Sequence, residues 1–134
     1  MEQMHFNPLA ILAATVSAFV LGGVWYSPLL FARSWMQAAG LTEEQVKQGN
    51  PGRIFGGAFV LTLVMAVNLA AFLGPKADLA FGLFAGFATG FGWVALGLGV
   101  VYLFEHRPLK QLLINGGYWT VALTVMGGIL GAWR

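Results

Sequence analysis

The chain has 134 residues, of which 58% are hydrophobic and only 9% are charged, and its formal net charge is +2. Soluble domains carry about a quarter charged residues, so a folded surface of this composition must face an apolar medium. The composition argues against an ordinary soluble domain, the absence of cysteine excludes disulfides and thiolate chemistry, and the scattered basic residues predict no nucleic-acid partner.

Four long apolar segments predict an all-α integral membrane protein. A spanning helix needs about 20 largely apolar residues, and lipid offers no hydrogen-bond partner to an open backbone. We therefore expect a single transmembrane domain, 1–134, built as a four-helix transmembrane bundle in the lipid bilayer. The predicted spans, none of which contains Asp, Glu, Lys, Arg or His, are Leu9–Trp25, Ile54–Leu73, Leu79–Leu103 and Leu112–Trp133.

Polar residues and prolines mark the ends of these segments. Asn7-Pro8 and Asn50-Pro51 are typical helix starts, because a proline in the first turn lacks only an N–H that would be unpaired anyway. The turns at 74–78 and 105–108 are short, which predicts antiparallel neighbours. No small-residue cleavage site follows the first segment, so we expect it to be retained as a helix.

The first loop, Tyr26–Arg53, is too long for a simple turn. Its segment Pro28–Ala39 predicts an interfacial helix with Trp35 anchored among the headgroups, and Gly40 is a suitable end. Thr42 to Gln45 resembles a capping box that opens a further short helix. The alternative is an ordinary loop that folds back on the bundle.

Basic residues predict the orientation in the membrane. Four spans put the first and third loops on one side, and these loops carry more Lys and Arg than the opposite side. The positive-inside rule then places both loops in the cytoplasm and both termini outside, in a multi-pass protein of the cell inner membrane. The loop residues are Arg33, Lys47, Arg53, Arg107 and Lys110, against Lys76 and Arg134.

Small residues form a stripe on the third span. Gly82, Gly86 and Gly90 are spaced by four and share one helix face, where two backbones can approach closely. Gly127 and Gly131 repeat the pattern on the fourth span. We favour close packing within one chain, and the alternative is the seam of a homo-oligomer.

Trp93, Asn68 and Asn115 lie within the predicted spans at depths where an unpaired polar group is costly. Trp93 is near the middle of the third span, and its indole N–H predicts a buried partner, for which Asn68, Thr62 and Thr124 are candidates by depth. Asn68 and Asn115 carry amides that predict hydrogen bonds between helices or a polar lining for a ligand.

Titratable groups are absent from the spans, which argues against proton-coupled transport. The two histidines, His5 and His106, are predicted on opposite sides of the membrane, so we expect no haem ligation by the pair. No paired carboxylates and no nucleophile with an adjacent base are visible. The sequence therefore predicts no catalytic residue, no metal site and no cofactor, and we expect the protein not to be an enzyme.

One block of residues resembles a known family. Trp25-Tyr26-Ser27-Pro28, with Phe31 and Trp35 after it, is similar to the domain of unknown function 1761 family of small bacterial membrane proteins, and the resemblance extends over the whole chain through Gly40–Glu44, Gly92-Trp93, Glu105 and Asn115–Tyr118. Family members commonly have Gly and a basic residue after the Phe; here Ala32 replaces the Gly, while Arg33 keeps the basic charge. The resemblance implies four spans and no established activity.

The residues that carry this resemblance suggest where a site would lie. They map near the predicted cytoplasmic boundary, where they form either a ligand site or a contact that holds the first loop on the bundle. We expect a membrane protein that binds or passes a small uncharged or amphiphilic molecule, or alternatively a structural subunit that acts through helix packing. The expected site residues are Trp25, Tyr26, Trp35, Glu105, Asn115 and Tyr118.

Overall fold

The computed structural model describes residues 6–133, and within that range it is helical without strands. Two residues used above, His5 and Arg134, lie outside the described range. Helices α5, η1 and α6 follow one another without a break and form one span. The elements are α1 Pro8–Trp25, α2 Ala32–Ala39, α3 Glu43–Lys47, α4 Pro51–Leu73, α5 Leu79–Thr89, the π-helix η1 Gly90–Ala95, α6 Leu96–Phe104 and α7 Leu109–Ala132.

The predicted four-span, all-α fold is confirmed. The described chain has four helices long and apolar enough to cross a membrane. Large apolar side chains such as Val20 and Phe84 are exposed on their outer faces, where lipid would cover them. Two helices begin before the apolar runs that predicted them, at Pro51 and Leu109, because a polar first turn at the boundary is still helical.

Side-chain caps explain where the helices begin. The Asn7 carboxamide accepts hydrogen bonds from the backbone of Leu9 and Ala10, and Asn50 and Asp78 cap α4 and α5 in the same way. The predicted capping box is present at Thr42. The Thr42 hydroxyl accepts from the backbone N–H of Gln45, and the Gln45 side-chain oxygen accepts from the backbone N–H of Thr42. These bonds satisfy amides that a helix start leaves unpaired.

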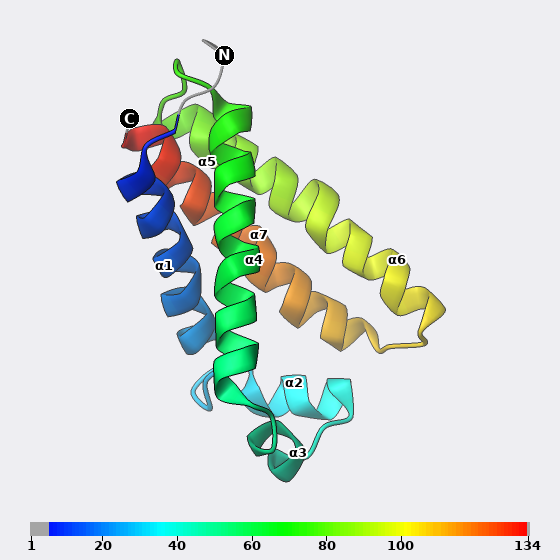
Figure 1. The fold of residues 1–134 in the computed structure, drawn as a ribbon. Helices are drawn as coiled ribbons and strands as arrows, with labels where there is room; N and C mark the ends of the chain where they lie inside the picture. The colour runs from blue at the N-terminus through cyan, green and yellow to red at the C-terminus, as the bar shows by residue number, and fades with distance from the viewer. Residues whose placement is uncertain (1–5, 134) are drawn as a thin grey trace.

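The first loop forms a helix that also folds back on the bundle. Residues Ser27–Phe31 make turns, so α2 begins at Ala32 rather than at Pro28. It ends at Gly40, whose backbone is left-handed with φ 72°. Helix α2 contacts α7, and together with α3 it lies across the end of the bundle opposite the start of α1 and the end of α7 (Figure 1).

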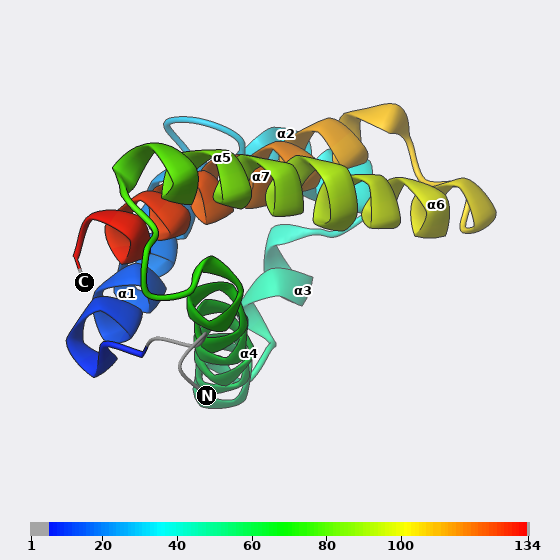
Figure 2. The ribbon, with the colours of Figure 1, turned by 90° about the horizontal axis from the view of Figure 1, so that it is seen from above.

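Helix α7 is the centre of the bundle. It contacts α1, α2, α4, α5, η1 and α6, and its apolar window is the most buried of the four. The continuous α5–η1–α6 helix runs antiparallel beside α7, whereas α4 packs mainly against α1 and touches α5 at few places. Figures 1 and 2 show α4 diverging from α5–η1–α6, so that the two approach each other only near the turn that joins them.

The glycine stripe lies in the contact between α5 and α7. A Cβ on Gly82 would overlap the backbone of Gly127, and a Cβ on Gly86 would lie 2.7 Å from the carbonyl carbon of Leu123. Glycine is therefore required for this backbone approach, as expected for packing within one chain. Because α7 covers this face, a homo-oligomer would need a different surface.

A π-helical turn carries this stripe along the whole span. The inward residues are spaced by four up to Gly90, then by five to Ala95, then by four to Gly99. A π turn closes i to i+5 hydrogen bonds and holds more residues than an α turn, so it takes up the five-residue step. Ala95 then packs against Gly116, and Gly99 lies beside Leu112, on the same side as the stripe.

Two predicted buried groups are instead exposed. The Trp93 side chain is 73% exposed, and Asn68 is exposed on the outer side of α4. Within residues 6–133 neither side chain makes a hydrogen bond. The prediction of a buried partner for Trp93 was wrong, because position along a span gives depth but does not say which way the side chain points. Thr62 and Thr124, the other candidate partners, bond carbonyls of their own helices.

Candidate functional site

Aromatic and amide side chains gather where α1 ends, α2 crosses and α7 begins. We call this set the aromatic cluster. It joins α1 and α2 to α6 and α7, which are distant in sequence from them, and five of its members were among the expected site residues. The members are Trp25, Tyr26, Trp35, Tyr102, Asn115 and Tyr118.

The Asn115 carboxamide connects two tyrosines. The Tyr26 hydroxyl donates to Asn115 Oδ1 at 2.7 Å, and Asn115 Nδ2 donates to the Tyr102 hydroxyl oxygen at 2.9 Å. The amide thus uses its acceptor and a donor, and it ties the end of α1 to both α6 and α7. Burial raises the pKa of the Tyr26 hydroxyl, with smaller contributions from Tyr118 and Tyr102, so this phenol keeps its proton and remains a donor.

Two further bonds fasten α1 to α7. The Trp25 indole Nε1 donates to the backbone oxygen of Ile114 at 2.9 Å, and the Tyr118 hydroxyl donates to the backbone oxygen of Ala18 at 2.7 Å. The two bonds join residues 89 and 100 positions apart in the chain. Such bonds between spans stabilise packing by roughly 0.6 kcal/mol on average in membranes.

Trp35 joins the cluster through ring contacts. Its ring meets that of Tyr26 edge to face with centroids 5.8 Å apart, and Tyr26 in turn lies 5.5 Å from Tyr118. The Trp35 indole N–H donates to neither Asn115 nor Tyr118 in the described structure, and both of these side chains bond other partners. Tyr26 therefore lies between α2 and α7.

Glu105 is placed outside this cluster. Its carboxylate pairs with Arg107 at 3.6 Å, and both side chains are about half exposed, so the pair adds little stability. Arg107 also donates to the backbone oxygen of Ala39 at 3.3 Å, and it thereby links the third loop to the end of α2.

Sequence reasoning left Tyr102 out of the site. A signal for it was present, because Tyr102 and Asn115 flank the same short turn and face each other in the hairpin. Gln111 was also missed. It lies one turn before Asn115 on α7, and among the described residues its Oε1 is the buried side-chain oxygen that has no partner.

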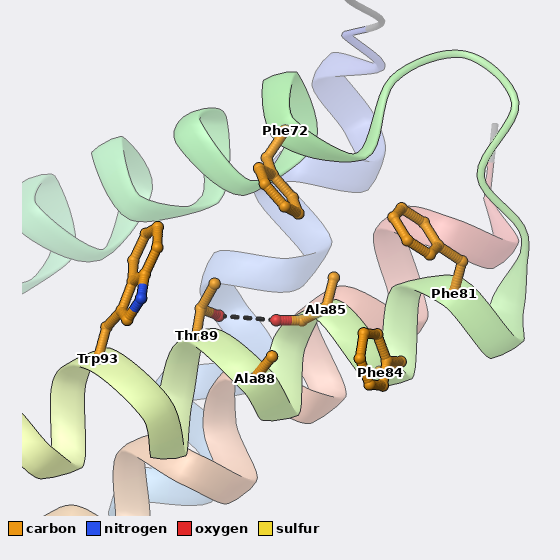
Figure 3. A pocket seen from close by; sticks show the side chains of 7 residues that line it. All are labelled: Phe72, Phe81, Phe84, Ala85, Ala88, Thr89 and Trp93. Atoms are coloured by element: carbon orange, nitrogen blue, oxygen red, sulfur yellow. Dashed lines mark hydrogen bonds between the residues drawn. The ribbon is translucent and has the colours of Figure 1, made fainter.

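A separate groove lies on the membrane-facing side, between α4 and α5–η1 (Figure 3). Its volume is about 140 Å³, and Trp93 projects from the π turn toward α4, opposite Phe72. The Thr89 hydroxyl bonds the backbone oxygens of Ala85 and Gly86, which leaves its own oxygen free to accept. The lining residues are Phe72, Phe81, Phe84, Ala85, Ala88, Thr89 and Trp93.

The groove and the cluster offer different chemistry. In the cluster the Trp25 indole, the Asn115 amide and the three tyrosine hydroxyls all have hydrogen-bond partners. The groove instead presents the unpaired Trp93 indole donor among aromatic and aliphatic walls, facing outward rather than packed between helices. Within residues 6–133 no three His, Cys, Asp or Glu side chains gather to hold a metal ion.

Comparison with known proteins identifies a family but no activity. No curated protein and no solved structure matches the chain. A family model described as protein of unknown function (DUF1761) matches residues 9–131, which include all but the first residue of α1 and the last of α7, and every residue of the aromatic cluster. The chain therefore belongs to the DUF1761 family, as its tryptophan block indicated.

Proposed function

We propose that the protein is a non-enzymatic binder of a small uncharged amphiphile, which it takes from the bilayer into the groove between α4 and η1. The observation that carries the proposal is Trp93. Its side chain is 73% exposed within an apolar span and has no hydrogen-bond partner in the described chain. Hydrocarbon offers no acceptor to the indole N–H, so a ligand that supplies one gains affinity there.

The groove selects by polarity and shape. Trp93 offers a donor, and Thr89, one turn earlier, offers an acceptor, which together suit a hydroxyl or ester group. Phe72, Phe81 and Phe84 supply walls for an apolar chain. None of the lining residues carries a charge, and a charged headgroup would be costly to desolvate there. The ligand class is therefore an uncharged lipid-like molecule with a hydroxyl.

The placement of Trp93 on a π turn supports this assignment. Single π turns inside α-helices occur frequently at functional sites. Here the turn keeps the inward stripe against α7 and leaves Trp93 on the outside. In this proposal the aromatic cluster has a supporting role, since it docks the first loop and fixes the first half of α7, against which η1 packs.

Binding of monooleoylglycerol to the purified protein in nanodiscs tests the proposal. We expect Trp93→Phe to weaken binding about fivefold, the scale of one hydrogen bond between partners in a membrane. The matched control is Trp133→Phe, which makes the same chemical change at the end of α7 and should bind as the wild type does. Equal affinities for all three proteins would contradict the proposal.

A structural or accessory subunit is the second candidate, and a different observation favours it. Asn68 is exposed on α4 within the apolar span and lacks a partner in the described chain. Polar groups inside spans rarely face lipid, because their hydrogen bonds then go unmade. Helix packing against another transmembrane segment would satisfy this amide.

We also propose the orientation that the basic residues predict, with the first and third loops on the cytoplasmic side of a bacterial inner membrane. The α2–α3 end and the α6–α7 turn then share the cytoplasmic side, in keeping with the contact between Arg107 and Ala39. A reporter that is active only in the cytoplasm should be active when fused after Gly49 and inactive when fused after Arg134. The reverse pattern would overturn the orientation.

A further inference from the structure

The outer face of α4 carries a heptad-spaced seam. Its residues alternate by four and three positions, which keeps them on one narrow stripe of a helix. All but the last are exposed, and a Cβ on the first, Gly57, would meet nothing within 4 Å. We call this stripe the α4 seam. It consists of Gly57, Leu61, Val64, Asn68 and Ala71.

The seam points away from its own bundle. The side of α4 that packs inward carries Thr62, Ala66, Leu69, Ala70 and Leu73, all buried. The α4 seam lies on the opposite side, where Leu61 is 68% and Val64 is 52% exposed. It also differs from the groove, which α4 lines with Phe72. An outward stripe of small and branched residues suits helix-to-helix contact in a membrane.

Asn68 makes lipid an unfavourable neighbour for this stripe. It lies five residues before the end of α4, roughly 7.5 Å inside the span, and its short side chain extends too little to reach the headgroups. Its amide has no hydrogen bond within residues 6–133. Each unmade bond of this kind in hydrocarbon is costly, so the amide calls for a partner at the same depth.

We propose that the α4 seam is the dimer interface with a second copy of this chain. Two copies inserted with the same orientation bring their α4 helices together in parallel, so that each Asn68 faces its equivalent across a two-fold axis. An amide carries both a donor and an acceptor, so two identical amides satisfy one another with one Nδ2–H to Oδ1 bond in each direction. A single asparagine at such a position is known to fix register and the number of strands.

The composition of the seam suits contact with a second copy of itself. The seam carries no charge, so bringing two identical surfaces together meets no repulsion. Gly57 and Ala71 at its two ends allow close approach, while Leu61 and Val64 fill the space between. The earlier candidate seam, the glycine stripe of α5, is buried against α7 and is not available.

Disulfide cross-linking in native membranes tests this interface, and a chain without native cysteine suits the experiment. We expect Val64→Cys to form a dimer of two copies on mild oxidation. The matched control is Val100→Cys on α6, which changes the same residue type at a similar exposure of 56% and should stay monomeric. Equal cross-linking at the two positions would indicate random collision and would overturn the proposal.

The role of the amide is measured separately, by energy transfer between labelled copies diluted in lipid vesicles. Asn68→Leu should raise the dimer dissociation constant about tenfold, as expected for loss of one or two bonds between spans. The variant places an apolar side chain against lipid, so its fold should persist. An unchanged constant, or cross-linking of Val64→Cys to a different protein, would overturn the assignment of a second copy.

Discussion

Gly86→Ala is expected to lower the free energy of unfolding by roughly 3 kcal/mol, at the upper end of the range for overpacked cores. The added Cβ would overlap the carbonyl oxygen of Leu123 and lie 2.8 Å from the Thr124 Cα. These are backbone atoms of α7, so relief requires α5 and α7 to move apart along the whole glycine stripe. The measurement is a denaturant titration of the protein in detergent micelles, followed by circular dichroism.

Gly97→Ala is the matched control for this substitution. It adds the same methyl group to α6, the later part of the same span, where a Cβ would meet nothing within 4 Å. We expect it to be neutral or to stabilise by up to about 1 kcal/mol, because alanine favours helix over glycine. Equal stabilities of Gly86→Ala and Gly97→Ala would contradict the close contact between α5 and α7.

Asn115→Ala should cost about 2 kcal/mol, since it removes the acceptor for Tyr26 and the donor to Tyr102 and leaves two hydroxyls without their partner. Tyr26→Phe removes one of these bonds and should cost about 1 kcal/mol. If the bond is real, the double variant should lose less than the sum of the two single losses, by about 1 kcal/mol. The same titration measures all three proteins, and strictly additive losses would show that the two side chains do not interact.

Features that depend on local sequence were predictable. The spans follow from hydropathy, the helix starts from Asn7, Asn50 and Thr42, and the end of α2 from Gly40. The packing of Gly82 and Gly86 was favoured for the same reason, because a spacing of four fixes a helix face whatever lies opposite. The aromatic cluster was located from residues at equal depth near one boundary.

Features that depend on how each helix is rotated were not predictable. Trp93 and Asn68 have the depths that the sequence predicts, but only the packed bundle decides that both face outward. The π turn corresponds to the five-residue step from Gly90 to Ala95 in the sequence. That step indicates a π turn only when both residues are known to face α7, which the sequence does not show. Glu105 was expected in the site from its depth near the boundary, but its side chain pairs with its neighbour Arg107 outside the cluster.

The rotation of α5–η1–α6 also decides the proposed function. A buried Trp93 would have been one more packing residue, and its loss would have weakened the fold. An exposed Trp93 beside Phe72 forms the wall of a groove open to the bilayer, so its loss should weaken ligand binding. The stability of Trp93→Phe is therefore expected to match the wild type, while its affinity falls.

Photolabelling with a monoacylglycerol that carries a diazirine in its acyl chain tests the proposed binding site most directly. After irradiation in membranes and digestion, mass spectrometry locates the adducts. We predict adducts concentrated on Phe72 and on the segment from Phe84 to Trp93, and their loss when unlabelled monooleoylglycerol is added in excess. Adducts spread evenly over outer residues such as Val20 and Val100, or gathered around Trp35 and Tyr118, would contradict the assignment of the groove as the binding site.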